Sequence, residues 1–256
     1  MEWLVLIVAF LGALLTFFSG FGLGTVLLPV MLIFLPPGTA VLCTAIIHFI
    51  NNGFKFTLIR KYIHVPIAIR FGVIAILGAF IGAQCISYVN QLGTAFTANW
   101  FSHAPKVSWI NLIIGVLLMA FALFENVKPK NLSLTPSISQ YIGGGLSGFF
   151  GGLSGHQGAL RSLFLSPLIK DKNAFVATGA AIALAVDVMR ILVYVGNGSF
   201  WASANTPIIF FGTAGAVMGT FLGRKLLKKI NYKMLHITVM VSLIALGLAM
   251  VTGLIY

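Results

Sequence analysis

The sequence predicts an all-α polytopic membrane protein made of two inverted repeats. Its composition, eight long apolar segments and a repeat in the order of those segments support this prediction. The chain has 256 residues, of which 59% are hydrophobic and 8% are charged, and its mean hydropathy is +1.04. A soluble domain carries about a quarter charged residues, so we expect lipid to be the solvent for most of this surface.

The apolar segments define the expected helices. They cover residues 3–35, 39–54, 66–89, 107–125, 138–169, 174–195, 206–223 and 234–255. Six of them have about 16–24 residues, close to the roughly 20 needed for one helical crossing. The first and the fifth are longer, and glycines interrupt each of them near its middle, at 19–24 and 151–158.

The two interrupted segments belong to a repeat. FFSG at 17–20 resembles FFGG at 149–152, and AVLCT at 40–44 resembles AFVAT at 174–178. Duplicated halves of this size are common in transporters. We therefore expect a first membrane repeat at 1–125, a cytoplasmic linker at 126–136 and a second membrane repeat at 137–256.

Most of the Lys and Arg that give the net charge of +12 lie in short segments between the apolar segments. This distribution is typical of topology determinants and not of nucleic-acid binding, so no nucleic-acid partner is expected. The basic loops, expected in the cytoplasm, are 55–70, 126–136, 170–173 and 224–233. The loops 90–106 and 196–205 carry one Lys between them and are expected outside.

Segment 138–169 has a basic loop at each end, which a single crossing does not allow. We therefore interpret it as a re-entrant hairpin of two half-helices, and the repeat predicts a second hairpin at 3–35 from the opposite face. Each half then has one hairpin and three transmembrane helices, and an odd number of spans makes the halves inverted. The alternative is eight plain transmembrane helices, four in each half.

The glycine breaks indicate where a ligand would bind. Half-helices that begin at about Gly24 and Gly158 would present free N–H groups and positive dipole ends near the midplane, and such helix ends bind anions. The alternative is that the glycines only allow close helix packing. The candidate substrate-binding residues are Gly22, Gly24, Thr25, Asn51, Asn52, Ser154, Gly155, His156, Gln157, Gly158 and Arg161.

Arg161 follows the second break by less than one turn. A buried Arg is costly and its planar fork suits an oxyanion, although it would equally suit carbonyls freed by the break. His156 and Gln157 lie in the break, and either can donate to a substrate. A role of His156 in satisfying local backbone groups is the alternative.

Asp187 and Arg190 are three residues apart, so they share a helix face and can pair. A structural pair is favoured over a proton or substrate relay, and His48 is the third member of this candidate group. Asn51 and Asn52 lie at equivalent depth in the first half. These two asparagines either form hydrogen bonds between helices or line a cavity.

Signatures of enzymes are missing. The chain has no HExxH, GxSxG or P-loop motif, and its four acids leave little acid–base capacity. The two cysteines, Cys43 and Cys85, lie in apolar segments without metal-ligand spacing. We therefore predict no enzyme, no metal and no cofactor.

With FSGFGLGTVLLP at 18–29 and GGLSGHQGALRSLFLSP at 151–167, the chain resembles the TauE/SafE sulfite exporter family over nearly its whole length. By this resemblance the family's glycine-rich signatures fall on Gly20, Gly22, Gly24, Pro29, Gly152, Gly155 and Gly158. The second motif departs from the family pattern, which has a further glycine cluster where this chain has His156, Gln157 and Arg161.

The resemblance implies secondary transport of sulfite, organosulfonates or related sulfur-containing anions across the bacterial inner (plasma) membrane. We expect an exporter that works by alternating access, with the site between the hairpin tips. The alternatives are an anion channel and a membrane subunit that scaffolds an enzyme partner. The expected partners are a small anionic substrate and the lipid bilayer, and a homodimer is a further expectation.

Overall fold

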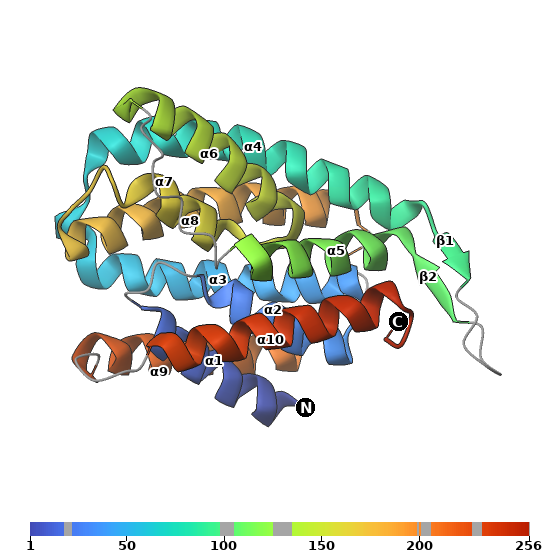
Figure 1. Cartoon of the computed structure of the whole chain (residues 1–256). Coiled ribbons are helices and arrows are strands. Elements are labelled where there is room, and N and C mark those ends of the chain that lie inside the picture. The colour runs from blue at the N-terminus through green and yellow to red at the C-terminus, as the bar shows by residue number, and fades with distance from the viewer. Residues whose placement is uncertain are drawn as a thin grey trace.

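The computed structural model describes residues 1–17, 22–97, 105–124, 135–198, 200, 206–226 and 232–255. Nearly all of them are helical (Figure 1). The helices are α1 (Glu2–Thr16), α2 (Leu23–Phe34), α3 (Pro37–Ile59), α4 (Val65–Gln91), α5 (Trp109–Phe124), α6 (Pro136–Ser154), α7 (Gln157–Leu165), α8 (Lys172–Gly196), α9 (Thr206–Leu226) and α10 (Tyr232–Val251), with a short 3-10 helix η1 (Arg60–Tyr62).

Four described helices are long and apolar enough to cross a membrane, namely α3, α4, α8 and α9. The 27 residues of α4 span about 40 Å at ~1.5 Å per residue, more than a hydrocarbon core of about 30 Å. The apolar helix α5 has 16 residues and borders residues outside the described part of the chain. The prediction of a polytopic, helical membrane protein is therefore confirmed.

One element departs from the all-α prediction. Between α4 and α5, where a loop was expected, the strands β1 (Thr94–Thr97) and β2 (Lys106–Ser108) pair antiparallel. They extend beyond the helix ends at one edge of the molecule (Figure 1). The sequence analysis missed them because each has three or four residues, too few for an alternating pattern to stand out.

The basic segments also differ from simple loops. Within the expected loop 55–70, Lys55 lies in α3 and Arg70 lies in α4, so only 60–64 connects the two helices. Arg224 and Lys225 belong to the last turn of α9. Lys172 begins α8, and Asp171 caps that helix by accepting a hydrogen bond from the Ala174 N–H at 2.7 Å. The predicted linker 126–136 lies outside the described residues except at its end.

The second glycine-interrupted segment forms a helical hairpin. The Ser147 hydroxyl, near the end of α6, donates to the carbonyl of Gln157 at the start of α7 at 3.2 Å. The Ser139 hydroxyl, near the start of α6, donates to the carbonyl of Phe164 at the end of α7 at 3.1 Å. These two bonds require α7 to run back antiparallel along α6.

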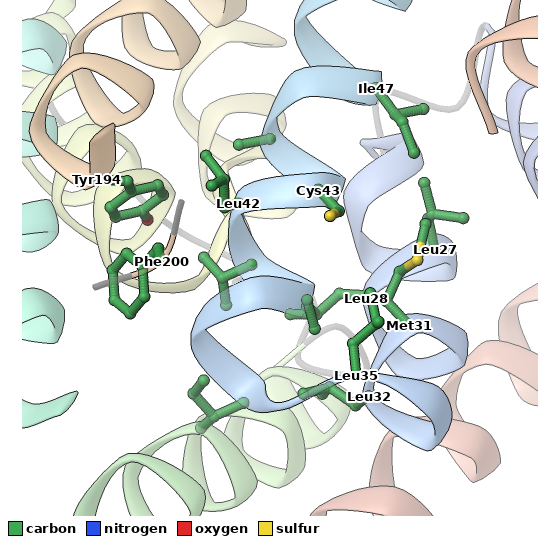
Figure 2. Packing of buried hydrophobic residues seen from close by; sticks show 14 of the residues in the cluster. Leu27, Leu28, Met31, Leu32, Leu35, Leu42, Cys43, Ile47, Tyr194 and Phe200 are labelled. Atoms are coloured by element: carbon green, nitrogen blue, oxygen red, sulfur yellow. The ribbon is translucent and has the colours of Figure 1, made fainter. Parts of the chain in front are cut away.

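The first interrupted segment also consists of two helices. α1 ends at Thr16 and α2 begins at Leu23, and the two helices pack against each other. Residues 19–21 of the predicted break lie outside the described part of the chain. An apolar face of α2 then packs on α3, where Leu28 and Met31 belong to the same buried cluster as Leu42 (Figure 2).

Rows of glycine bring α6 close to α4 and α9 close to α1. On α6, a Cβ on Gly148 would collide with the backbone of Ala75 in α4, and one on Gly152 with that of Ala79. On α9, a Cβ on Gly219 would collide with the backbone of Phe10 in α1. Small residues four apart permit this approach of helix backbones.

The helix pairs follow a pattern. α6 packs on α4 and α1 packs on α9; α8 packs on α4 and α3 packs on α9. α3 also packs on α8, and α5 on α10. When α1 to α5 are exchanged in order for α6 to α10, the α4–α6 pair becomes α1–α9 and the α4–α8 pair becomes α3–α9, while α3–α8 and α5–α10 stay the same pairs.

Candidate functional site

The two glycine breaks meet inside the molecule. Gly155 ends α6 in the left-handed conformation with φ 84°. A Cβ placed on Gly24 would lie 3.3 Å from the carbonyl oxygen of Gly155, and one placed on Gly22 would lie 4.0 Å from the Cα of Gly158. The structure therefore brings together four of the glycines that the sequence analysis selected.

Two helices begin at this meeting point. α2 has Gly22 as its N-cap and α7 has His156, and neither residue provides a side-chain capping hydrogen bond. The first N–H groups of both helices, and the positive ends of their dipoles, are therefore directed into one region. Thr25 is buried in the first turn of α2, where its N–H donates to the Gly22 carbonyl at 3.1 Å.

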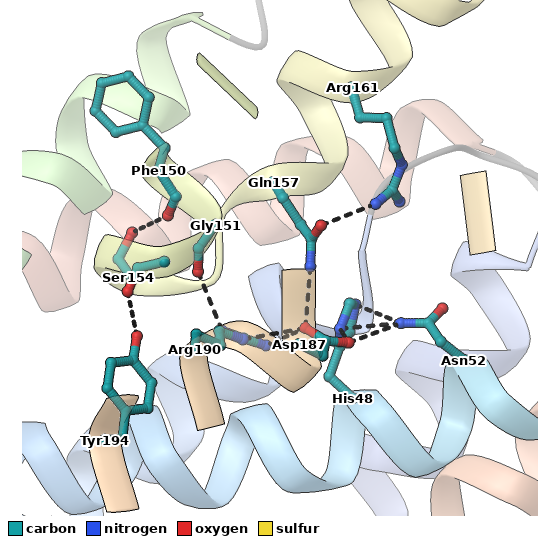
Figure 3. A network of polar contacts seen from close by, with 11 residues as sticks. His48, Asn52, Phe150, Gly151, Ser154, Gln157, Arg161, Asp187, Arg190 and Tyr194 are labelled. Carbon is teal, nitrogen blue, oxygen red and sulfur yellow. Dashed lines mark hydrogen bonds and ion pairs between the residues drawn. The ribbon is translucent and has the colours of Figure 1, made fainter. Parts of the chain in front are cut away.

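Asp187 of α8 is the centre of a buried polar network (Figure 3). Its Oδ2 lies 2.7 Å from Nδ1 of His48 in α3 and accepts a hydrogen bond from Asn52 at 3.4 Å. Its Oδ1 accepts from the Gln157 amide at 3.0 Å and from Nε of Arg190 at 3.0 Å. One carboxylate thus joins α3 of the first half to α7 and α8 of the second.

Arg190 and Tyr194 bind the last carbonyls of α6. Nη1 of Arg190 donates to the Gly151 carbonyl at 3.4 Å, and the Tyr194 hydroxyl donates to the Gly152 carbonyl. The Gly151 carbonyl also accepts from the Gly155 N–H at 3.0 Å, whereas the helix end leaves the Gly152 carbonyl without a partner inside the helix. Arg190 therefore holds both Asp187 and the hairpin. Tyr194 was missed by the sequence analysis, and its position one turn after Arg190 is the signal that could have revealed it.

Arg161 of α7 reaches the network through Gln157. Its Nη1 donates to Oε1 of Gln157 at 3.1 Å, while the amide of Gln157 donates to Asp187. Arg161 is 7% exposed, and the ion pairs found in the described part of the chain do not include it. Its guanidinium thus retains donors for a ligand.

His156 lies apart from this network. Its ring stacks on Phe121 of α5 with centroids 5.1 Å apart, and its Nδ1 lies 3.1 Å from the Ser154 hydroxyl. Its Nε2 is buried and has no hydrogen-bond partner among the described residues. A buried polar atom without a partner is costly, so this nitrogen at the start of α7 is available to a ligand.

The two adjacent asparagines take different positions. Oδ1 of Asn51 accepts a hydrogen bond from Thr220 of α9 at 2.6 Å, which links two helices. Asn52 faces the other way, toward His48 and Asp187. The structure therefore brings Asn52 into the network and leaves Asn51 at a helix contact.

The structure adds one cation that the sequence analysis assigned to a loop. Lys55 of α3 is 7% exposed, and its Nζ lies 5.3 Å from the centre of the Phe17 ring. Lys55, Asn52 and Arg161 line one cavity. The spacing of 48, 52 and 55 places these side chains on one helix face, a signal that could have identified Lys55.

Comparison with known proteins gives one result. The family model described as Sulfite exporter TauE/SafE matches residues 5–250. No curated protein and no solved structure matches the chain.

Proposed function

The chain belongs to the TauE/SafE sulfite exporter family, and on this premise we propose that it is a secondary transporter that exports sulfite or another small sulfur-containing oxyanion. The anion would bind where the two glycine breaks meet. The N–H groups at the starts of α2 and α7, the guanidinium of Arg161 and the side chains of His156 and Gln157 would hold it.

The observation that carries this proposal is the charge balance of the buried network. Among the described residues, Asp187 is the only buried acid, and it is paired with Arg190. Arg161 and Lys55 are also buried, so cations outnumber acids there. A buried charge without a partner costs several kcal/mol, and an anion between two helix N-termini would offset that cost.

An inverted repeat of two re-entrant hairpins would provide the movement. Two observations support this architecture. The α4–α6 and α4–α8 pairs correspond to the α1–α9 and α3–α9 pairs when the two halves are exchanged, and α6 and α7 run antiparallel. The His48–Asp187 contact joins α3 to α8 across the two halves. Rocking of one repeat against the other would expose the site to each side in turn.

Export fits the membrane potential. The inside-negative potential favours outward movement of an anion by about 2.3 kcal/mol per charge per 100 mV. In this orientation the basic segments 55–70, 126–136, 170–173 and 224–233 face the cytoplasm of a bacterial cell. An exporter of anions then needs no coupling ion.

The experiment is sulfite flux into proteoliposomes that contain the purified chain. We expect saturable flux that sulfite on the opposite side accelerates, which a channel would not show. Arg161→Ala should lower the flux at least about tenfold, because a charge-assisted hydrogen bond contributes roughly 1.5–3 kcal/mol, and Arg161→Lys should retain part of it. Flux unchanged in both variants would move the site away from Arg161.

Two outcomes would favour the alternatives. Flux that does not saturate and shows no counterflow would indicate an anion channel. A purified chain without any sulfite flux would remove the substrate or require a partner protein, as expected for a membrane subunit that scaffolds an enzyme.

A further inference from the structure

A small cavity lies beside the buried polar network. The C-terminal part of α3 and the N-terminal part of α8 form two of its walls, so it lies toward the end of the molecule that carries Arg60, Lys61 and Lys170. Its volume is about 30 Å³, room for roughly two water molecules. This volume is closer to that of a compact inorganic anion than to that of an organosulfonate with a carbon chain.

Two cations face this cavity from opposite halves of the chain. Lys55 comes from α3 and Arg161 comes from α7, and each is 7% exposed. Among the described residues that line the cavity there is no Asp or Glu. Among the described residues, the Lys55 ammonium contacts the ring of Phe17, whereas Arg161 donates to Gln157.

We infer that this cavity is a two-cation site that selects doubly charged inorganic oxyanions over singly charged ones, with Lys55 as the residue that sets the preference. The inference rests on the proposed function, with which this cavity shares Arg161 but not the residues of the glycine breaks, and it narrows the substrate class. A single cation attracts both kinds of anion, but a second buried cation is fully neutralised only by a second negative charge. An amino-sulfonate would also place its ammonium group near Lys55 or Arg161, which like-charge repulsion disfavours.

The polar groups of the cavity agree with an oxyanion. Asn52 and Ser162 line the cavity together with the two cations. Gly179 of α8 also lines the cavity, and a Cβ placed on it would lie 3.4 Å from Nε of Arg161. A small residue at this position leaves room on that side of the guanidinium.

The test compares anions of fixed charge, because sulfite itself exchanges between singly and doubly charged forms near neutral pH. Thiosulfate and sulfate serve as dianions, and methanesulfonate and nitrate serve as monoanions. Each is used to inhibit labelled sulfite flux in proteoliposomes. In the wild type, the dianions should inhibit at lower concentrations than the monoanions.

Lys55→Met removes the charge and keeps the length of the side chain. It should raise the half-inhibitory concentration of the dianions about tenfold or more, as expected for loss of one charge-assisted contact, and change that of the monoanions far less. Lys55→Arg should keep the preference. Lys61→Met is the matched control, because Lys61 lies six residues later in η1 and is exposed, and its Nζ lies 5.0 Å from the centre of the Tyr62 ring.

Stabilisation of the purified protein by the same anions in detergent provides a readout that needs no flux. Dianion stabilisation that disappears in Lys55→Met, but not in Lys61→Met, would support the inference even if sulfite flux were absent and the transport proposal failed. Sulfite flux with the same anion preference in wild type and Lys55→Met would overturn this inference and leave the transport proposal standing. Equal stabilisation of the wild type by dianions and monoanions would overturn it as well.

Discussion

At the scale of single residues, Asp187 combines more contacts than any other side chain of the network described above. It accepts hydrogen bonds from Asn52, Gln157 and Arg190 and lies within 2.7 Å of His48. Arg190 is completely buried, so its charge depends on this carboxylate. The pair therefore stabilises the junction of α3, α7 and α8, while Arg161 keeps donors for a ligand.

Asp187→Asn should destabilise the protein strongly. Loss of one member of a buried pair leaves the other charge unpaired, which costs roughly 3–5 kcal/mol. The double variant with Arg190→Gln should recover part of this loss, and thermal unfolding in detergent measures both. The control is Asp171→Asn on the same helix, which should be nearly neutral because Asn also caps helices well. Strictly additive effects of Asp187→Asn and Arg190→Gln would show that the two residues are not coupled.

At the scale of elements, the position of each hairpin depends on backbone contact between helices. α6 lies against α4 at Gly148 and Gly152, and α1 lies against α9 at Gly219. In lipid, such contacts replace the hydrophobic effect as the source of helix association. Gly152 was assigned to the glycine signature by resemblance, and the structure places it at this helix contact rather than at the tip of the hairpin.

Gly148→Ala should displace the α6–α7 hairpin. Its new Cβ would meet the backbone of Ala75, which cannot move without shifting α4, so we expect a loss of about 1–3 kcal/mol from overpacking. Gly145→Ala on the same helix is the control. Its Cβ would meet only Ile74 at an ordinary distance of 3.7 Å, and Ala favours a helix over Gly by about 0.5–1 kcal/mol. In thermal unfolding in detergent, the midpoint of Gly145→Ala should be at or above that of the wild type and the midpoint of Gly148→Ala below it. A higher midpoint for Gly148→Ala than for Gly145→Ala would contradict this account.

At the scale of the whole molecule, the question is which ends of the helices share a side of the membrane. The proposed hairpin places the start of α6 and the end of α7 on one side, whereas a single crossing by segment 138–169 places them on opposite sides. The antiparallel contacts between α6 and α7 favour the first arrangement.

Cysteine labelling tests this topology. In a background without Cys43 and Cys85, we expect Ser137→Cys and Lys170→Cys, both at exposed positions, to be labelled by an impermeant maleimide only from the cytoplasm. Leu92→Cys, at the C-terminal end of α4, should be labelled by the same maleimide from outside, in intact cells. Labelling of Ser137→Cys and Lys170→Cys from different sides would overturn the hairpin and favour eight plain helices.

Most of the helices were predictable because their signals are local. Apolar length identified α3, α4, α8 and α9, and glycine clusters located both breaks, since helix ends depend on residues nearby in sequence. The short strands β1 and β2 and the helical position of Lys55 were missed. A lysine at the end of an apolar run is read as a loop residue, and only the packing of α3 shows that it is buried.

By itself the sequence determined the helical membrane class, the positions of the glycine breaks and the set of polar residues within apolar segments. Only the tertiary structure decided how those polar residues divide. It brings His48 into contact with Asp187, 139 positions away, and Arg190 into contact with the end of α6. It also bonds Asn51 to Thr220 and places Lys55 and Arg161 in the lining of one cavity. The physical reason is that length and hydropathy are properties of one segment, whereas the partner of a buried charge depends on which helices pack together.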